Sequence, residues 1–137
     1  MRTALFFLLC AANISASAAT LSATGEEAAR NAALQWLQVV DSGNYKDAAL
    51  MMSEDVRGTR DWPNYLAIQR GSLGRVNKRQ IVEVKRASTI PGAHGVRSYA
   101  IVRFKTSFDQ KSNAMEEVTL AKMGCCWEVR DYQISGR

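Results

Sequence analysis

The side chains able to do chemistry are few in this chain, and they lie far apart. His94 is the single histidine among 137 residues, and it stands in a Pro-Gly-Ala-His-Gly turn. A general base needs a positioned partner, yet no carboxylate or cysteine lies near His94 in the sequence. We therefore interpret His94 as a surface residue of a solvated turn, with no catalytic role.

Sequence motifs of hydrolases and metal sites are absent. The chain contains no Gly-x-Ser-x-Gly, no His-Glu-x-x-His and no pair of Cys-x-x-Cys motifs. One histidine and the two adjacent thiols of Cys125 and Cys126 argue against a zinc site built by the protein. We expect no metal, no cofactor and no catalytic residue.

Cys125 and Cys126 are the most unusual local feature of the sequence. A disulfide between them would be strained, because bridged Cα atoms prefer about 5.5–6 Å and neighbouring Cα atoms lie about 3.8 Å apart. They are nevertheless a candidate disulfide. Pairing between two molecules and two free thiols in a turn are the alternatives that the sequence leaves open.

The densest basic stretch comprises Arg70, Arg75, Lys78 and Arg79. In an exported protein such a stretch meets lipid headgroups or cell-wall anions rather than nucleic acid, which we do not expect as a partner. Cations also suit the C-terminal end of a helix. We favour this second interpretation, a solvated helix end.

A candidate ligand site rests on Arg86, Tyr99, Phe104 and Glu116. Helices over a curved sheet often leave a concave cavity, and the chain has enough aromatic side chains to line one, although the same side chains are the expected core. Arg86 and Glu116 fall in phase with the apolar residues of their predicted strands, near strand ends, which places them at the rim of such a cavity. A surface ion pair is the interpretation that we favour for these two charges.

Helical periodicity dominates the first half of the chain. Thr24-Gly25-Glu26-Glu27 fits a capping box, and apolar residues including Trp36 then recur at helical spacing. Gly43 fits a helix stop. Two further helices are predicted, a short one over residues 45–52 and one over residues 62–73.

After Gly74 the period changes to two, which predicts four strands. Their core-facing residues are expected to be Val82, Val84, Val96, Ala100, Val102, Phe104, Phe108, Val118, Leu120, Trp127 and Val129. Tyr132 and Ile134 are out of phase with Trp127 and Val129, which predicts a bulge near Arg130 and Asp131. We expect Trp36 and Trp127 to be largely buried.

This order of elements predicts an α+β domain with N-terminal helices on one face of a curved, antiparallel sheet of about four strands. Its boundary follows from the N-terminus, where Arg2 precedes an apolar run over residues 4–12 and then Ala16-Ser17-Ala18. That arrangement is typical of a secretory signal peptide. We expect residues 1–18 to be removed with Cys10, leaving a single domain over residues 19–137 in the periplasm or outside the cell.

An ordered set of residues spans positions 28–134. It comprises Trp36-Leu37, Asp41-x-Gly43-x-Tyr45, Trp62, Arg70-x-x-Leu73-Gly74, Arg79, Pro91-Gly92, Tyr99, Phe104, Phe108, Glu116-Glu117-Val118 and Trp127-x-Val129-x-x-Tyr132-x-Ile134. The set resembles the domain-of-unknown-function family 4019 of exported bacterial proteins. The resemblance implies a cystatin-like or nuclear-transport-factor-like cone and no particular activity. The chain departs from the family at Asp47-Ala48, where a Ser-Trp pair is usual, and at Cys125-Cys126, where Asp-Gly is usual.

Three functions are compatible with these features. We favour a non-enzymatic binding or accessory protein of the cell envelope, monomeric or weakly dimeric, whose partner is an envelope protein or a small ligand. The alternatives are a pocket enzyme of the nuclear-transport-factor-like isomerase type and a protein inhibitor acting through residues 91–95. The predicted core positions supply no acid or base for the enzyme. The formal net charge of +5, which falls to +4 with the loss of Arg2, favours at most peripheral contact with anionic membrane or cell-wall surfaces.

Overall fold

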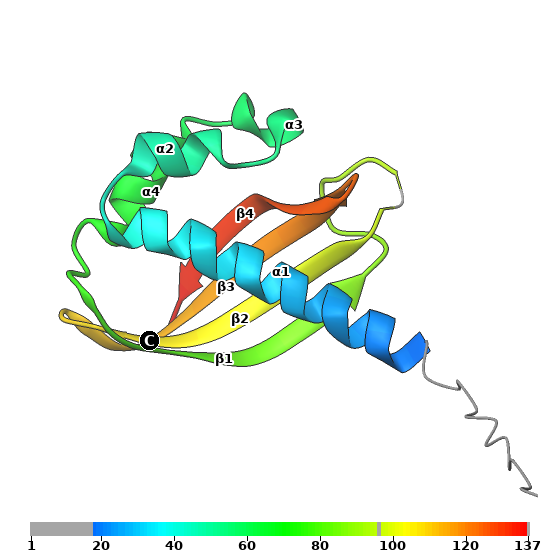
Figure 1. The fold of residues 1–137 in the computed structure, drawn as a ribbon. Coiled ribbons are helices and arrows are strands. Elements are labelled where there is room, and N and C mark those ends of the chain that lie inside the picture. The colour runs from blue at the N-terminus through cyan, green and yellow to red at the C-terminus, as the bar shows by residue number, and fades with distance from the viewer. Residues whose placement is uncertain (1–17, 96, 137) are drawn as a thin grey trace, which may run out of the picture.

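The computed structural model describes residues 18–95 and 97–136 (Figure 1). The charged start and apolar run of the expected signal peptide lie outside the described residues, and so does Val96. Four helices come first: α1 (Ala18–Asp41), α2 (Tyr45–Leu50), α3 (Glu54–Arg57) and α4 (Trp62–Arg70). Four strands follow: β1 (Val76–Ala87), β2 (Tyr99–Phe108), β3 (Lys111–Met123) and β4 (Cys126–Ser135).

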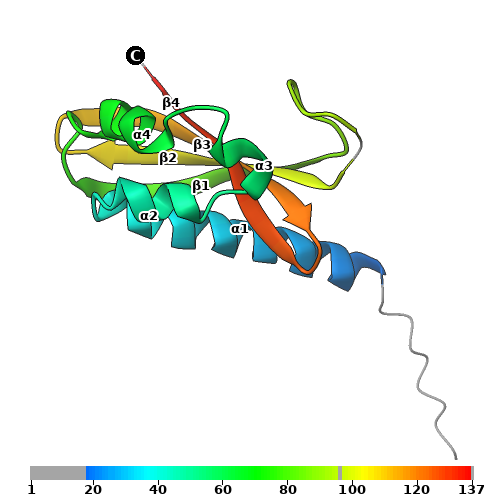
Figure 2. The same ribbon diagram turned by 90° about the horizontal axis from the view of Figure 1, so that it is seen from above.

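The strands form one antiparallel sheet in the order β1-β2-β3-β4, so each strand pairs with its neighbour in sequence. Helix α1 crosses one face of the sheet and contacts all four strands (Figure 1). Figure 2 shows α1 on one side of the strands, and α4 packs on α2. The predicted α+β class, with helices before an antiparallel sheet, is confirmed.

Helix α1 begins earlier than the sequence pattern predicts. It starts at Ala18, so the Thr24-Gly25-Glu26-Glu27 segment lies inside the helix and does not cap it. The alanines before Thr24 have high helix propensity, and they continue the helix past the capping signal. Its end agrees with the prediction, because Gly43 adopts a φ of 79° just after Asp41. Helix α4 ends at Arg70, before the predicted Leu73, and α3 was not predicted.

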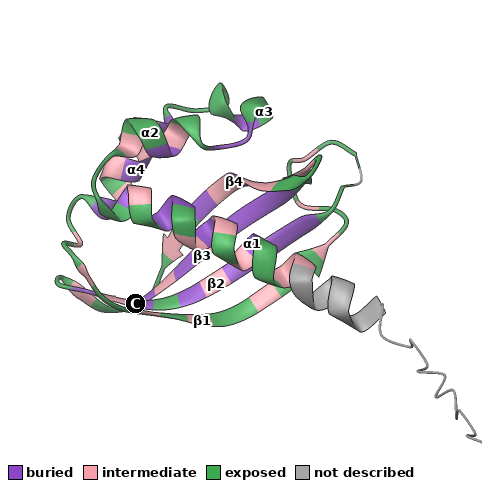
Figure 3. Ribbon diagram, viewed as in Figure 1, coloured by how far each residue is buried: buried purple, intermediate pink, exposed green. Residues whose placement is uncertain are grey.

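The core lies between α1 and the sheet, where Figure 3 shows buried segments on the strands beneath the helix. Trp36 is 1% exposed and donates its indole N–H to the carbonyl oxygen of Ala48 at 2.8 Å, which confirms its predicted burial. Trp127 is partly buried and packs against the same core, less deeply than Trp36. Arg86 covers its ring, with the guanidinium 5.0 Å from the ring centroid.

Two bulges decide which strand residues face the core. Thr119 pairs with Asp131 and Leu120 pairs with Val129. Arg130 therefore has no cross-strand pairing partner on β3, which confirms the predicted bulge. A second bulge, in β1, skips Val82 between Ile81 and Glu83. Val82 is therefore 51% exposed, and the prediction that it faces the core was wrong, whereas Ile81 and Val84 contact the core.

Candidate functional site

Four charged side chains meet at one edge of the core, and we call them the ion cluster: Asp41, Arg70, Arg79 and Glu116. Asp41 is the last residue of α1, Arg70 is the last residue of α4, Arg79 lies on β1 and Glu116 lies on β3. Both helices end here, so the cluster ties them to the sheet.

Arg79 forms paired contacts with both carboxylates. Its Nε donates to Oε2 of Glu116 at 2.7 Å and its Nη2 to Oε1 at 3.1 Å. Its Nη1 and Nη2 donate to Asp41 at 2.7 and 3.0 Å. Arg70 donates to Asp41 at 2.7 Å and lies 3.6 Å from Glu116. Two positive and two negative charges balance, and paired Arg–carboxylate contacts hold both partners in one geometry.

Two hydroxyl groups complete the surroundings of Glu116. Thr106 donates to Oε2 at 2.5 Å and Tyr132 donates to Oε1 at 2.6 Å. Burial raises the pKa of the Tyr132 hydroxyl well above its ordinary value, and the charge of Glu116 acts in the same direction, so this hydroxyl keeps its proton. Both oxygens of Glu116 therefore accept hydrogen bonds from protonated donors.

Asp41 is also held in its charged form. Burial alone would raise the pKa of its carboxyl group, but hydrogen bonds from Arg79 and Arg70 outweigh burial and lower the pKa below the ordinary value. The carboxylate of Asp41 thus stays charged at neutral pH. The geometry of the ion cluster is that of a structural bridge, because each carboxylate oxygen already has a donor from the chain.

The positions of these residues correct two predictions. Glu116 was placed at a solvent-exposed rim, but it is 0% exposed and faces the core beside Thr106 and Tyr132. Arg70 was placed in a solvated helix end, but it is buried, and Arg79 is nearly so. The carboxylates of Asp41 and Glu116 offset the cost of removing both guanidinium groups from water. The local sequence does not show these pairings, because the partners lie on different elements.

The four predicted ligand-site residues do not form one site. Phe104 and Glu116 are cross-strand partners on β2 and β3. Tyr99 is also buried. It precedes Phe104 by five residues on β2, which separates the two by roughly 17 Å at about 3.4 Å per residue. Arg86 is exposed and covers Trp127. The predicted cavity between helices and sheet is instead occupied by packed side chains, including Trp36 and Phe104.

A groove of about 670 Å³ lies on the face of the sheet opposite α1, which we call the outer face. This outer groove has one wall from the α3–α4 segment, a second from the β1–β2 loop and a floor from the strands. The wall residues are Asp55, Val56, Thr59, Arg60 and Trp62 on one side and residues 90–94 and Arg97 on the other, and the floor residues are Ile101, Glu117, Thr119, Arg130, Asp131 and Gln133.

Charges of both signs are fixed within the outer groove. Asp55 accepts from Ser53 at 2.5 Å and from Arg130, and Arg97 lies 3.9 Å away from it. The hydrogen bond from Ser53 is the main cause that lowers the pKa of Asp55. Arg60 stands over the rings of Trp62 and Tyr65, at 4.6 and 4.4 Å from their centroids. Such stacking orients a guanidinium while leaving its N–H groups to a ligand.

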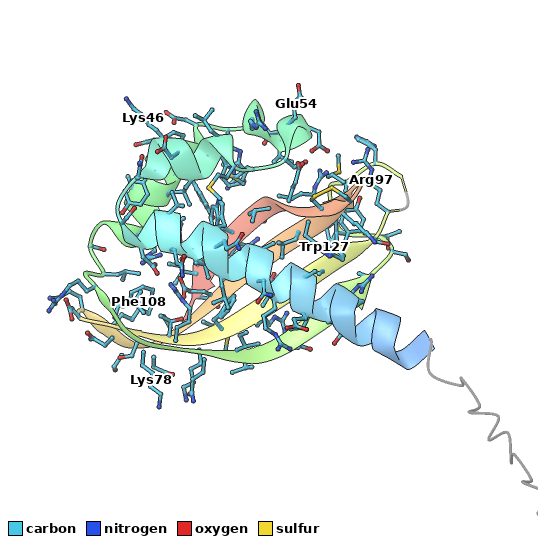
Figure 4. All side chains as sticks on the ribbon, in the orientation of Figure 1. Lys46, Glu54, Lys78, Arg97, Phe108 and Trp127 are labelled. Atoms are coloured by element: carbon cyan, nitrogen blue, oxygen red, sulfur yellow. A yellow bond between two sulfur atoms is a disulfide. The ribbon has the colours of Figure 1, made fainter. Side chains whose placement is uncertain are left out.

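The loop that carries His94 was predicted as a solvated turn. His94 is exposed, but the structure also places it in a wall of the outer groove. Arg97, labelled in Figure 4, ends the same loop and donates to the sulfur of Met123 at 3.3 Å. The sequence did not indicate this groove, because its residues come from separate segments that only the tertiary fold assembles.

Cys125 and Cys126 stand at the tip of the β3–β4 hairpin, beside the left-handed Gly124, which has a φ of 61°. The structure joins their sulfur atoms in a disulfide. Among the described residues, no three His, Cys, Asp or Glu side chains are grouped to hold a metal ion.

A helical layer over an open four-stranded antiparallel sheet, with charges bridged inside and a polar groove outside, defines a small α+β domain. The family model described as "Protein of unknown function (DUF4019)" matches residues 32–132, and the chain belongs to this family. No curated protein matches the chain. All four residues of the ion cluster lie within the matched range.

None of the helices in the described part of the chain is both long and apolar enough to cross a membrane.

Proposed function

We propose that this protein is an exported, non-enzymatic binding domain of the cell envelope, and that the outer groove holds a polar segment of a partner protein. The observation that carries the proposal is the groove itself. Its volume of about 670 Å³ falls within the usual range of ligand sites, roughly 300–1,000 Å³.

The chemistry of the walls supports a polar occupant. Arg60, Arg97 and Arg130 provide guanidinium donors. The acceptors are the carboxylates of Asp55, Glu117 and Asp131. An extended polypeptide presents both N–H and C=O groups along its length, and a groove with donors and acceptors on its walls can bond to both. The balanced charges favour a polar segment over a strongly charged one.

The enzyme alternative finds less support. An acid or base must reach its substrate, whereas both oxygens of Glu116 are occupied and the residue is 0% exposed. The inhibitor alternative relied on residues 91–95 as a protruding loop. Residues 91–94 line the outer groove, so this loop belongs to the same binding surface.

Photo-crosslinking in the native host tests the groove. A photoreactive phenylalanine analogue replaces Gln133, an exposed residue of the groove floor, and in a matched control it replaces Gln38, an exposed residue of α1. We expect the Gln133 position to yield an adduct of one defined mass that the Gln38 position does not give. Replacing Arg97 by glutamine in the Gln133 background should lower the yield, because it removes a wall donor.

Two results would contradict the groove assignment. One is the same set of adducts from both positions, which would indicate random collisions. The other is no protein adduct from Gln133 together with a small molecule retained in native mass spectrometry, which would replace the protein partner by a small ligand.

The compartment has its own test. Arg2, the apolar residues 4–12 and Ala16-Ser17-Ala18 support export. Mass spectrometry of the protein recovered from its host should give an N-terminus within about two residues of Ala19, where signal peptidases cut after an Ala-x-Ala sequence. An intact Met1, or a lipid attached to Cys10, would overturn the proposal of a cleaved signal peptide.

A further inference from the structure

A second hollow, of about 200 Å³, lies at the opposite end of the sheet from the His94 loop. We call it the basic pocket, and it is lined by Lys78 and Gln80 of β1, Lys105, Thr106 and Ser107 of β2, and Ser112 of β3. Lys78 pairs with Ser107 and Gln80 pairs with Lys105 across the β1–β2 ladder. Directly paired residues place their side chains on the same face of a sheet, so these four groups lie together.

The positive charge of the basic pocket is not neutralised. Among the residues that the structure describes, no carboxylate lies within ion-pairing distance of Lys78 or Lys105. The nearby carboxylate of Asp109 accepts from the backbone and side chain of Arg75 instead. Both lysines are exposed, so they are free to bind an anion.

The strand alternation explains why this charge was hidden in the sequence. Arg79 stands between Lys78 and Gln80 but points to the opposite face, where Asp41 and Glu116 neutralise it. The basic stretch therefore divides in two. Its arginines Arg70 and Arg79 are bridged inside the protein, while Lys78 projects outward and meets Lys105 from the next strand.

The donors of the basic pocket suit one small oxyanion. Two ammonium groups, two serine hydroxyls and an amide supply N–H and O–H donors around a single hollow. The volume is below the range usual for larger ligands, roughly 300–1,000 Å³, and the lining holds no apolar side chain for a hydrophobic ligand. A phosphate group has the charge and the acceptors that these donors require.

We propose that the basic pocket binds the phosphate of an anionic lipid headgroup and so docks this end of the sheet on a membrane surface. Lys78 and Lys105 are both exposed on the outer face, so this face presents unneutralised positive charge to a membrane surface. The formal net charge of +5, which becomes +4 once Arg2 is removed with the signal peptide, favours the same partner. The proposal is independent of the outer groove, because the two sites share no residue.

Vesicle sedimentation tests this docking. The wild-type protein is expected to bind vesicles of equal parts phosphatidylglycerol and phosphatidylcholine and to remain free of vesicles of phosphatidylcholine alone. Lys78→Gln combined with Lys105→Gln should weaken binding about tenfold or more, since each lysine near an anionic surface contributes appreciably. The matched control, Lys46→Gln with Lys122→Gln, removes two exposed lysines away from the pocket and should weaken binding much less.

Three further measurements separate the pocket from general charge effects. Inorganic phosphate should reduce vesicle binding by the wild type more than chloride at equal ionic strength, because it competes for the pocket. Equal losses in the two double variants would overturn the pocket, and so would unchanged binding by the Lys78→Gln, Lys105→Gln variant. Binding of inorganic phosphate without binding to phosphatidylglycerol vesicles would overturn the membrane assignment. Unfolding midpoints close to the wild type should show that both variants are folded.

Discussion

Replacing Glu116 by alanine is expected to destabilise the domain by about 3–5 kcal/mol, a range measured when one partner of a buried ion pair is removed. Glu116 is 0% exposed and accepts hydrogen bonds from Arg79, Thr106 and Tyr132. Without its carboxylate, Arg79 keeps only Asp41 as a partner, and two hydroxyl groups lose their acceptor. Urea unfolding of the wild type and the variant measures the difference.

The neighbouring residue provides the matched control. Glu117 points to the outer face and pairs with Arg103, whose side chain is 44% exposed. Because water screens such a pair, Glu117→Ala should leave the unfolding midpoint almost unchanged. Similar losses in the two variants would contradict the assignment of Glu116 as the centre of a buried bridge. Glu116→Gln keeps the shape but removes the charge, and it should fall between the wild type and Glu116→Ala.

Most of the fold could be predicted from local patterns. The helical spacing around Trp36 defines a single apolar stripe, and that stripe packs on the sheet. The change to period two after Gly74 locates the strands. The shift of phase between Val129 and Tyr132 reveals the bulge at Arg130, because a bulge is itself a local change of period.

The errors share a physical cause, which is that sequence patterns do not identify distant partners. Val82 fits a regular alternation, and only its pairing with β2 shows that the chain bulges there. Glu116 lies in phase with core residues, but a carboxylate is buried only when donors reach it. Its donors, Arg79 and Tyr132, lie on β1 and β4, so the burial of Glu116 depends on tertiary contacts.

Replacing Trp36 by alanine is the second change with a large expected effect, about 3–5 kcal/mol, as for large-to-small substitutions of core aromatics. Trp36 is 1% exposed, its indole N–H donates to Ala48 and its ring meets the Tyr132 ring edge-on at 5.3 Å between centroids. Removing it opens a cavity and leaves a carbonyl of α2 without its donor. The control is Trp127→Ala, which should cost clearly less in urea unfolding because that ring is only partly buried. Trp36→Phe should recover part of the loss, since it refills the cavity without restoring the hydrogen bond. Equal losses for Trp36→Ala and Trp127→Ala would show that α1 does not pack its tryptophan between α2 and the sheet.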